Sequence, residues 1–392
     1  MDRRDFLATM ARLGLAVPLG TTFGCGAQPA SAEGGEPETG SVLIIGAGAA
    51  GLAAGYLLAQ RGVPFQILEA SPRWGGRMKR TADFADFPIP LGAEWLHAAE
   101  AELTAIINDP ARPVPVETVG YAPEEPAGWF EDGELSFEPT GATPDRKFVG
   151  STWYDFFAQA IVPSVQDRIV LETPVAEVQH GPDGVRLLDR DGGEWTADAV
   201  IVTVPLPVLK RGDLRFSPPL PAERQAVIAQ APVWGGIKVF MEFTEQFYPA
   251  VLAFPDSNTA TGQRLYYDAA FGQDSQTHVM GLFAVGAQAQ PYQALAGDAL
   301  RDHVLAELDE VFAGRATPAY VKHIAQDWSA EPFIHGAYLA DNAPDEVAEA
   351  LAEPVGDTLY FAGEAYADSE DWGGVHNATQ AARRAVAALL GG

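Results

Sequence analysis

The sequence predicts an α/β protein whose folded part opens with a parallel β–α–β unit. Residues 41–45 form a short apolar run rich in β-branched side chains, which is typical of a buried parallel strand. A helical pattern with leucines on one face follows and stops at Gly62. A second apolar run over residues 65–68 predicts the next strand. These observations together predict a doubly wound, Rossmann-like nucleotide-binding domain.

The composition narrows the classes of function before any motif is considered. The chain has 392 residues, of which 47% are hydrophobic and 20% charged, so it predicts a packed protein of two or three domains. Its net charge of −28 repels phosphate backbones, which excludes nucleic-acid binding. Cys25 is the only cysteine, and the seven histidines show no metal-ligand spacing. The sequence therefore predicts neither a disulfide framework nor a metal site.

Residues 1–32 are interpreted as a targeting segment that is not part of the fold. Arg3 and Arg4 precede a mostly apolar run over residues 7–23, a pattern that resembles a twin-arginine export signal. The alternative is a disordered end with two chance arginines. An arginine, a glycine and a proline interrupt the apolar run, so we expect no membrane span here.

Cys25 lies near the end of this segment, and the sequence allows two alternatives for it. Cleavage after Ala32 would remove it, and lipid attachment would keep it as an anchor. Residues 33–40 then form a flexible acidic linker. We expect an exported protein, periplasmic or secreted, that leaves the cytoplasm already folded around its cofactor.

Three glycines follow the first predicted strand, and each has a physical role. Gly46 allows a tight turn, Gly48 lets the backbone approach a pyrophosphate, and Gly51 lets the helix pack closely. The N–H groups of the helix N-terminus can bind the phosphates. Glu69, at the end of the second predicted strand, can accept hydrogen bonds from a ribose 2′-hydroxyl. The alternative is a packing turn, which does not explain Glu69.

The residues after Glu69 favour FAD over NAD. The stretch 71–77 contains Gly76 and Arg77, which provide a second close backbone approach and a cation beside the ribose carboxylate. An extended FAD suits this arrangement. At the other end of the chain, Gly374 precedes an alanine-rich helix predicted over residues 375–390, whose dipole can stabilise negative charge on a reduced flavin.

Further blocks in the same order along the chain resemble the flavin-containing amine oxidases, a family that includes monoamine oxidases, polyamine oxidases, L-amino-acid oxidases and lysine-specific histone demethylases. The blocks are residues 91–97, 168–210, 235–240, 328–338 and 359–364. The resemblance implies a Rossmann-like FAD-binding domain, discontinuous in sequence, interleaved with an α+β substrate domain as in monoamine oxidases. The implied FAD-binding segments are 41–115, 165–215 and 352–392, and the implied substrate segments are 116–164 and 216–351.

The middle of the chain supports this organisation through its own pattern. Residues 175–178 and 185–188 alternate as strands around a Gly-Pro-Asp-Gly turn, which predicts a hairpin. Residues 197–204 predict one buried strand, and prolines precede a helix predicted over residues 222–230.

The resemblance also implies contacts to the cofactor. The implied contact residues are Gly92, Ala93, Val175, Gly363, Glu364, Gly374 and Val375. Ala337 stands where monoamine oxidases attach the flavin through cysteine, so non-covalent FAD is expected. Ser71 stands where an arginine is often found, so the phosphate charge is expected to rest on Arg77, the glycine N–H groups and the helix end.

Five residues are candidates for the chemistry. Lys238 lies in an apolar strand pattern, where a buried charge is costly without a partner. The family's matching lysine contacts flavin N5 through a water; the alternative is a strand-edge lysine that reaches solvent. The resemblance places Tyr338 as an aromatic residue facing the flavin, and Glu94 and His97 as contacts to the substrate amine. Trp372 lies just before the glycine pair that caps the last predicted helix, and we expect it to form a second aromatic wall. A structural role for His97 is an equal alternative.

We therefore expect a flavin-dependent amine oxidase acting on a polyamine- or monoamine-type substrate. The resemblance implies hydride transfer from the amine α-carbon to flavin N5, hydrolysis of the imine, and reduction of O2 to H2O2. The alternatives are a flavin-dependent desaturase or dehydrogenase with another acceptor, and an exported flavoprotein without turnover. The sequence determines neither the amine nor the oligomeric state.

Overall fold

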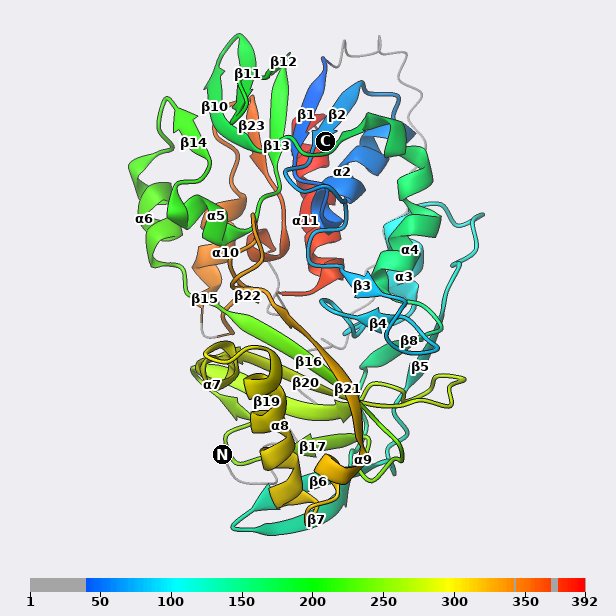
Figure 1. Cartoon of the computed structure of the whole chain (residues 1–392). Helices are drawn as coiled ribbons and strands as arrows, with labels where there is room; N and C mark the ends of the chain where they lie inside the picture. Colours follow the sequence, from blue (N-terminus) through cyan, green and yellow to red (C-terminus); the bar gives the residue numbers. More distant parts are fainter. Residues whose placement is uncertain (1–39, 342, 368–372, 392) are drawn as a thin grey trace, which may run out of the picture.

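A five-stranded parallel sheet forms the upper half of the molecule in Figure 1. The computed structural model describes residues 40–341, 343–367 and 373–391. In spatial order the strands are β23 (Leu359–Phe361), β13 (Ala199–Val202), β1 (Val42–Ile45), β2 (Phe65–Leu68) and β9 (Ile169–Val170). β1 lies at the centre and is fully buried, as its apolar sequence predicts. The chain winds outward in both directions from β1, which places a topological switch point at the carboxyl end of this strand.

Helices from both ends of the chain cover one face of this sheet. α2 (Ala49–Gln60) follows the first glycine turn and packs beside α11 (Val375–Leu389) in one hydrophobic core. α4 (Trp153–Ala160) adds large aromatic side chains to the same core. The remaining helical segments on this side are α3 (Ala101–Ile107), η1 (Val162–Ser164) and η2 (Gln166–Arg168).

The other face of the parallel sheet packs against a four-stranded sheet. Its strands are β12 (Glu194–Ala197), β11 (Gly184–Asp189), β10 (Val175–Gly181) and β14 (Arg215–Ser217). β10 and β11 pair antiparallel with Gly181 opposite Gly184, which confirms the predicted hairpin. The helices on this side are α5 (Leu206–Arg211), α6 (Ala222–Gln230), α10 (Asp345–Ala352) and η4 (Glu364–Tyr366). α6 has the predicted bounds.

A largely antiparallel sheet builds the lower half (Figure 1). Its strands are β21 (Tyr320–Asp327), β16 (Gly236–Phe243), β20 (His278–Gly286), β19 (Gly262–Asp268), β17 (Val251–Ala253), β6 (Pro126–Glu131) and β7 (Glu134–Pro139), with β18 (Asn258–Thr259) beside β19. The helices that pack with it are η3 (Ala287–Ala289), α7 (Gln290–Gln293), α8 (Gly297–Val311) and α9 (Ala316–Ala319). β16 lies between β20 and β21 and is therefore an inner strand.

Short strand pairs complete the fold. They are β3 (Arg80–Thr81) with β4 (Ile89–Pro90), β5 (Glu117–Gly120) with β8 (Arg146–Val149), and β15 (Val233–Trp234) with β22 (Tyr338–Leu339). The predicted strand over residues 197–204 is shorter than expected, because residue 197 ends β12 and only 199–202 pair with β1. Within the described ranges, no helix is both long and apolar enough to cross a bilayer. The predicted α/β class is confirmed.

Candidate active site

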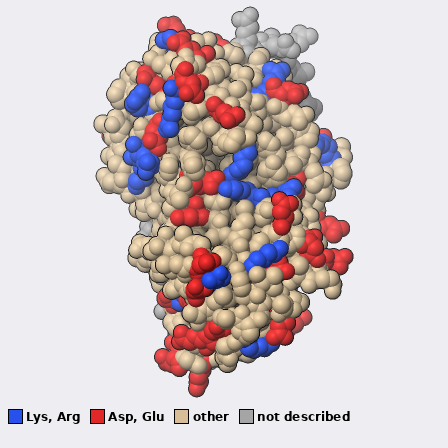
Figure 2. Space-filling view, viewed as in Figure 1, with Lys and Arg blue, Asp and Glu red and all other residues tan. Residues whose placement is uncertain are grey.

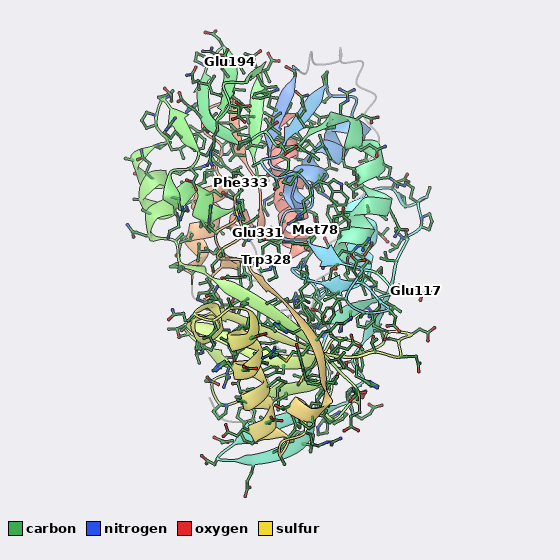
Figure 3. The ribbon with its side chains drawn as sticks, viewed as in Figure 1. Met78, Glu117, Glu194, Trp328, Glu331 and Phe333 are labelled. Carbon is green, nitrogen blue, oxygen red and sulfur yellow. The ribbon has the colours of Figure 1, made fainter. Side chains whose placement is uncertain are left out.

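A cavity of about 1200 Å³ lies between the two halves. It exceeds the roughly 300–1,000 Å³ of ordinary ligand pockets, so it can hold a long cofactor together with a substrate. Met78 and Trp328, which line it, lie near the junction of the two halves in Figure 3, and Phe333, which also lines it, lies at the level of the upper half. Figure 2 shows Lys and Arg side chains gathered across the middle of the same face. The carboxyl ends of β1 and β2 open into this cavity, where nucleotides bind in such sheets.

The first glycine turn has the geometry of a phosphate-binding loop. Gly46 has a φ of +102°, which favours glycine, and a Cβ on Gly51 would lie 1.9 Å from the Gly46 carbonyl oxygen. By contrast, a Cβ on Gly48 would meet no atom within 4 Å. Gly48 lines the cavity and caps the N-terminus of α2. Gly46 and Gly51 are therefore required by the turn itself, and Gly48 leaves room for a ligand.

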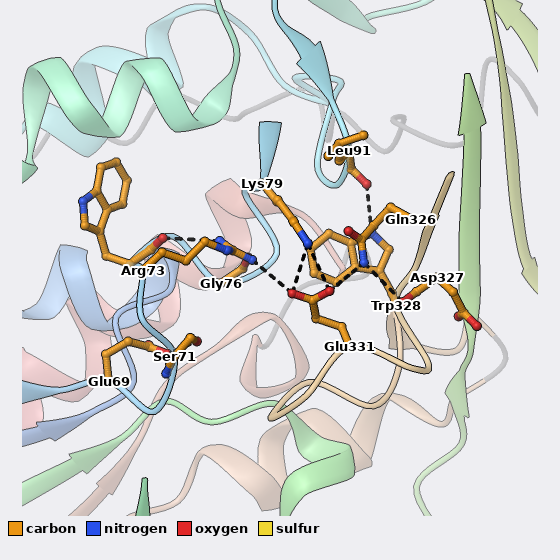
Figure 4. Close-up of polar contacts among 11 residues, drawn as sticks. Glu69, Ser71, Arg73, Gly76, Lys79, Leu91, Gln326, Asp327, Trp328 and Glu331 are labelled. Carbon is orange, nitrogen blue, oxygen red and sulfur yellow. Dashed lines mark hydrogen bonds and ion pairs between the residues drawn. The ribbon is translucent and has the colours of Figure 1, made fainter. Parts of the chain in front are cut away.

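Glu69 organises the loop beside this turn. Its buried carboxylate accepts hydrogen bonds from the Ala47 N–H (2.7 Å), the Ser71 N–H (2.8 Å) and the Ser71 hydroxyl (2.5 Å). Figure 4 shows Glu69 and Ser71 together, with Arg73 and Gly76 further along the same loop. A Cβ on Gly76 would lie 3.3 Å from the Gly48 Cα, so the two loops approach each other closely. Glu69 also lines the cavity.

Arg77 has protein partners at the edge of the cavity. Its Nη1 donates to Glu364 Oε1 at 2.9 Å and also to the Ala337 carbonyl oxygen. The second oxygen of Glu364 accepts from the Leu339 N–H at 3.3 Å. The positive charge of Arg77 is thus paired with a carboxylate, and Arg77 also lines the cavity. The N–H groups of the glycine turn and the N-terminus of α2 can bind phosphate as well.

The other expected cofactor contacts also line the cavity. These residues are Gly92, Ala93, Val175, Gly363, Glu364, Gly374 and Val375. A Cβ on Gly92 would lie 1.8 Å from the Arg77 carbonyl oxygen and 2.8 Å from the Trp328 ring. Gly374 caps α11, whose N-terminal end therefore faces the cavity. Both glycine-rich helix ends meet at one cavity, as the sequence predicts for a dinucleotide between them.

A polar cluster holds the lower half against the nucleotide-binding loop (Figure 4). Glu331 accepts from Lys79 at 3.1 and 3.2 Å and from Gln326 at 2.8 Å, and it lies 3.6 Å from Arg73. Burial raises the pKa of Glu331, but these hydrogen bonds and cations lower it overall. Trp328 donates from its indole N–H to the Leu91 carbonyl at 3.0 Å. These contacts fix the cavity wall across the two halves.

Lys238 and Glu94 form a buried ion pair in the cavity wall. Lys238 Nζ lies 2.6 Å from Glu94 Oε2, and the side chains are only 6% and 2% exposed. The same oxygen accepts from the Tyr267 hydroxyl at 2.5 Å. Because β16 is an inner strand, Lys238 does not reach solvent along a sheet edge. Glu94 lines the cavity, and its carboxylate is paired with a protein cation. The expected contact with a substrate amine stays a prediction.

A second lysine that the sequence reasoning missed completes this cluster. Lys147 Nζ lies 3.3 Å from Glu94 Oε1 and is equally buried. Burial raises the pKa of Glu94, but the charges of Lys238 and Lys147 lower it overall, so it is ionised. Burial lowers the pKa of Lys238, and Lys147 lowers it further, although Glu94 acts in the opposite direction. We name Lys147, Glu94 and Lys238 the buried charge triad.

The remaining chemical candidates also lie at the cavity, with one exception. His97 Nδ1 is 2.8 Å from Asp145 Oδ1, and both residues line the cavity. Tyr338 lines it as well, and burial raises its pKa well above the ordinary value, so its hydroxyl is neutral. Trp372 lies outside the described residues. No group of three or more His, Cys, Asp or Glu suited to a metal ion occurs in the described part of the chain.

Comparisons with known proteins decide the family. Residues 145–390, more than half of the chain, match the family described as flavin containing amine oxidoreductase. The chain belongs to this family. Residues 44–109 also match the NAD(P)-binding Rossmann-like domain. The protein is therefore a flavin-dependent amine oxidoreductase.

Relatives of this amine oxidoreductase match over half of its length or more. Polyamine oxidase 4 of Oryza sativa subsp. japonica is 25% identical over 86% of this chain and 86% of its own. Lysine-specific histone demethylase 1B of Mus musculus is 27% identical over 50% of this chain and 25% of its own. Cyclohexylamine oxidase from Brevibacterium oxydans IH-35A superposes with a TM-score of 0.74 at 16% identity, covering 90% of this chain and 98% of the other. The structure of putrescine oxidase bound to putrescine superposes with a TM-score of 0.73 at 17% identity, covering 90% of this chain and 99% of the other. These two structures show the same fold.

The residues of this amine oxidoreductase fit FAD. Three features of the cavity suit a dinucleotide. They are the open space at Gly48, the two helix N-termini that line the cavity, and Glu69, the candidate carboxylate for the ribose. Bound FAD supplies the two-electron redox chemistry of the family. The cofactor is held non-covalently, and Ala337, which lines the cavity, offers no side chain for a thioether.

Several residues of the site were not predicted. They are Asp145, Lys147, Tyr267, Trp95 and Phe283. Lys147 shares the feature that drew attention to Lys238, because it precedes an apolar pair in a short strand and is one of five lysines. The same criterion would have found it. The positions of the other four depend on contacts between distant segments.

Proposed function

We propose that the protein oxidises small amines at the C–H bond next to nitrogen and passes the two electrons to O2, forming H2O2. The amine loses two electrons and two protons to become an imine, which water converts into a carbonyl compound and a free amine or ammonia. The observation that carries this proposal is Lys238, buried in the wall of the same cavity that the two helix N-termini line. In that position its ammonium can hold a water molecule for imine hydrolysis.

The walls of the cavity suit an amine with an apolar body. Trp95, Phe283 and Tyr338 line it with rings, and Trp95 and Phe283 meet edge to face at 6.3 Å between centroids. Such rings bury the carbon chain of a substrate and attract a nearby ammonium.

We further propose that the substrate carries a second, distal ammonium, as diamines and polyamines do. Asp145 and Asp341 line the cavity, in addition to the buried Glu94. Asp145 faces His97, and Asp341 accepts from Gln263 at 2.6 Å. A carboxylate that lies away from the reacting nitrogen can bind the distal ammonium of a diamine or polyamine.

Anaerobic titration of the yellow holoprotein tests both statements. Matched series of monoamines, diamines, polyamines and amino acids are added, and loss of flavin absorbance is recorded. We expect diamines or polyamines to bleach the flavin at lower concentration than monoamines of equal length, and Asp145→Asn to reduce that difference. Bleaching by none of the amines would overturn the reaction, and a preference for monoamines would overturn the distal site. Steady-state rates with O2, a dye or a quinone identify the acceptor.

We also propose export through a twin-arginine route, supported by Arg3, Arg4 and the apolar run that follows. These residues lie outside the described part of the structure. A fusion of residues 1–40 to a reporter tests the proposal. We expect export that is lost when both arginines become lysine, and a reporter that stays in the cytoplasm would overturn it.

A further inference from the structure

Lys147 is a buried cation that the proposed reaction does not use. Its side chain on β8 is 3% exposed, and it is not among the residues that line the cavity. Its Nζ donates to the carbonyl oxygens of Asp268 (3.0 Å) and Ala269 (2.9 Å) and lies 3.3 Å from Glu94 Oε1. Two of the N–H groups of Lys147 therefore have carbonyl acceptors, and the carboxylates of Glu94 and Asp268 both act on its charge.

Lys238, the other lysine of the triad, has a different environment. Beside Glu94 Oε2 at 2.6 Å, its hydrogen-bond acceptor among the described residues is the Pro90 carbonyl oxygen, at a long 3.4 Å. Its other neighbours are the rings of Trp95, Phe240 and Tyr267, at 5.1–5.7 Å. Unlike Lys147, Lys238 is among the residues that line the cavity.

The charge of the triad is unbalanced when all three groups are ionised. Two ammonium groups then share one carboxylate, and an excess charge in a buried site is costly. Loss of one proton from either lysine makes these three groups neutral. Lys238 is the better donor, because its residue lines the cavity and Glu94 is its one carboxylate partner, whereas Lys147 does not line the cavity and the Asp268 carboxylate also acts on its charge.

We propose that Lys147 is a positioning residue that sets the charge of Lys238: it remains the permanent counter-cation of Glu94, so that Lys238 releases and regains a proton toward the cavity. In this step the Lys238 N–H bond breaks, its electron pair stays on nitrogen, and the proton passes to a cavity water. The uncharged amine still donates one hydrogen bond to Glu94 and turns its lone pair to the cavity.

The other titratable groups around the triad are consistent with this assignment. Burial raises the pKa of Tyr267 and of Tyr121, so both phenols stay neutral beside Glu94. Burial also raises the pKa of Asp268, whose carboxylate acts on Lys147. Asp145 lies further out, where it acts on Tyr121. On the strands that flank β16, the partners of Lys238 are the uncharged Phe283 and Gln326.

Lysine-selective NMR of the holoprotein tests the proposal without any turnover. The chain has five lysines, so ¹³Cε labelling gives few resonances, which single Lys→Met variants assign. In the wild type we expect Lys238 to titrate at lower pH than Lys147. In Lys147→Met, Lys238 becomes the only lysine beside Glu94, and its midpoint should move to higher pH. Lys147→Arg should leave the midpoint close to that of the wild type. The control Lys322→Met removes a half-exposed lysine paired with Glu242 and should not move it.

Two results would overturn the proposal: Lys147 losing its proton before Lys238 in the wild type, or an unchanged Lys238 midpoint in Lys147→Met. If Lys147→Met does not fold, the order in which the two lysines of the wild type lose their protons decides alone. The inference also has a kinetic consequence: the pH profile of anaerobic flavin reduction should shift in Lys147→Met. Only this consequence rests on the proposed function. If no amine reduces the flavin, the proposed function fails and the NMR order is still measured.

Discussion

Glu94 Oε2 lies 2.6 Å from Lys238 Nζ, although the two residues are 144 positions apart in the chain. Glu94 belongs to the loop after β4, which meets the nucleotide-binding half, and Lys238 belongs to the large sheet of the lower half. One buried ion pair therefore joins the two halves at the cavity that they share. Substitutions at this pair affect the chemistry and the stability of the fold in ways that can be separated.

Lys238→Met should leave FAD bound and slow flavin reduction or reoxidation by at least about tenfold, or about 1.4 kcal/mol of barrier. The reason is the loss of the Lys238 amino group from the cavity wall, where it can bind a water molecule or release and regain a proton. Stopped-flow absorbance of the two half-reactions measures both rates. Lys322→Met is the matched control and should leave them unchanged. Equal rates in Lys238→Met and the wild type would remove Lys238 from the mechanism.

Glu94→Gln should destabilise the protein by about 3–5 kcal/mol, because it leaves two buried ammonium groups without their counter-charge. Chemical denaturation at neutral pH measures the loss. Glu194→Gln is the control: this residue pairs with Arg186 on the surface, far from the cavity in Figure 3, and should cost no more than about 1 kcal/mol. Equal losses in the two variants would show that the triad does not stabilise the fold.

The difference in the free energy of unfolding between the wild type and Glu94→Gln should depend on pH. The lysines lower the pKa of Glu94 below its unfolded value of 4.5. Its stabilising contribution is therefore complete above pH 4.5 and is lost as the pH falls through the lower folded value. The free energies of unfolding of wild type and Glu94→Gln should differ by a constant amount near neutral pH and converge in acid. A difference that grows below pH 4.5 would contradict this assignment.

Gly48→Ala and Gly51→Ala should separate ligand binding from folding. An added methyl at position 51 would lie 1.9 Å from the Gly46 carbonyl, so Gly51→Ala should destabilise the apoprotein by about 1–3 kcal/mol. The space beside Gly48 is open, so Gly48→Ala should leave the apoprotein as stable as before and weaken FAD at least about tenfold. Thermal unfolding and flavin fluorescence titration give the two quantities. A destabilised Gly48→Ala apoprotein would contradict the assignment of the open space beside Gly48 to the cofactor.

Glu69→Ala should weaken FAD retention. The substitution removes the carboxylate expected at the ribose and its bonds to Ala47 and Ser71, which hold the adjoining loop. The fraction of protein that keeps its flavin after dilution measures the effect, with Glu194→Ala as the control. Full occupancy after dilution would count against the ribose contact.

The glycine turn could be predicted because its requirements are local. Gly46, Gly48 and Gly51 lie within six residues, and each has a role fixed by its own backbone and nearest strand. Lys238 could be found for a similar reason, since an apolar strand makes any charge within it conspicuous. In both cases the neighbouring residues in sequence contain the evidence.

The roles of Arg77 and Glu94 could not be predicted in this way. Arg77 has its partner Glu364 at a separation of 287 residues, and nothing near Arg77 in the sequence indicates that its charge is balanced. Glu94 lies between two lysines from β8 and β16. Which charges meet is decided by the docking of the two halves, and that docking depends on the packing of whole sheets.

The cofactor cavity is closed by residues from both extremes of the described chain. The glycine turn at Gly46 and Gly48 faces Gly374 and Val375 at the start of α11, and Arg77 takes its carboxylate partner from the segment just before that helix. A ribosome completes the turn long before it releases the closing helix. Tight capture of FAD is therefore a post-translational event, and nascent chains that stall before α11 is made will emerge without a binding pocket.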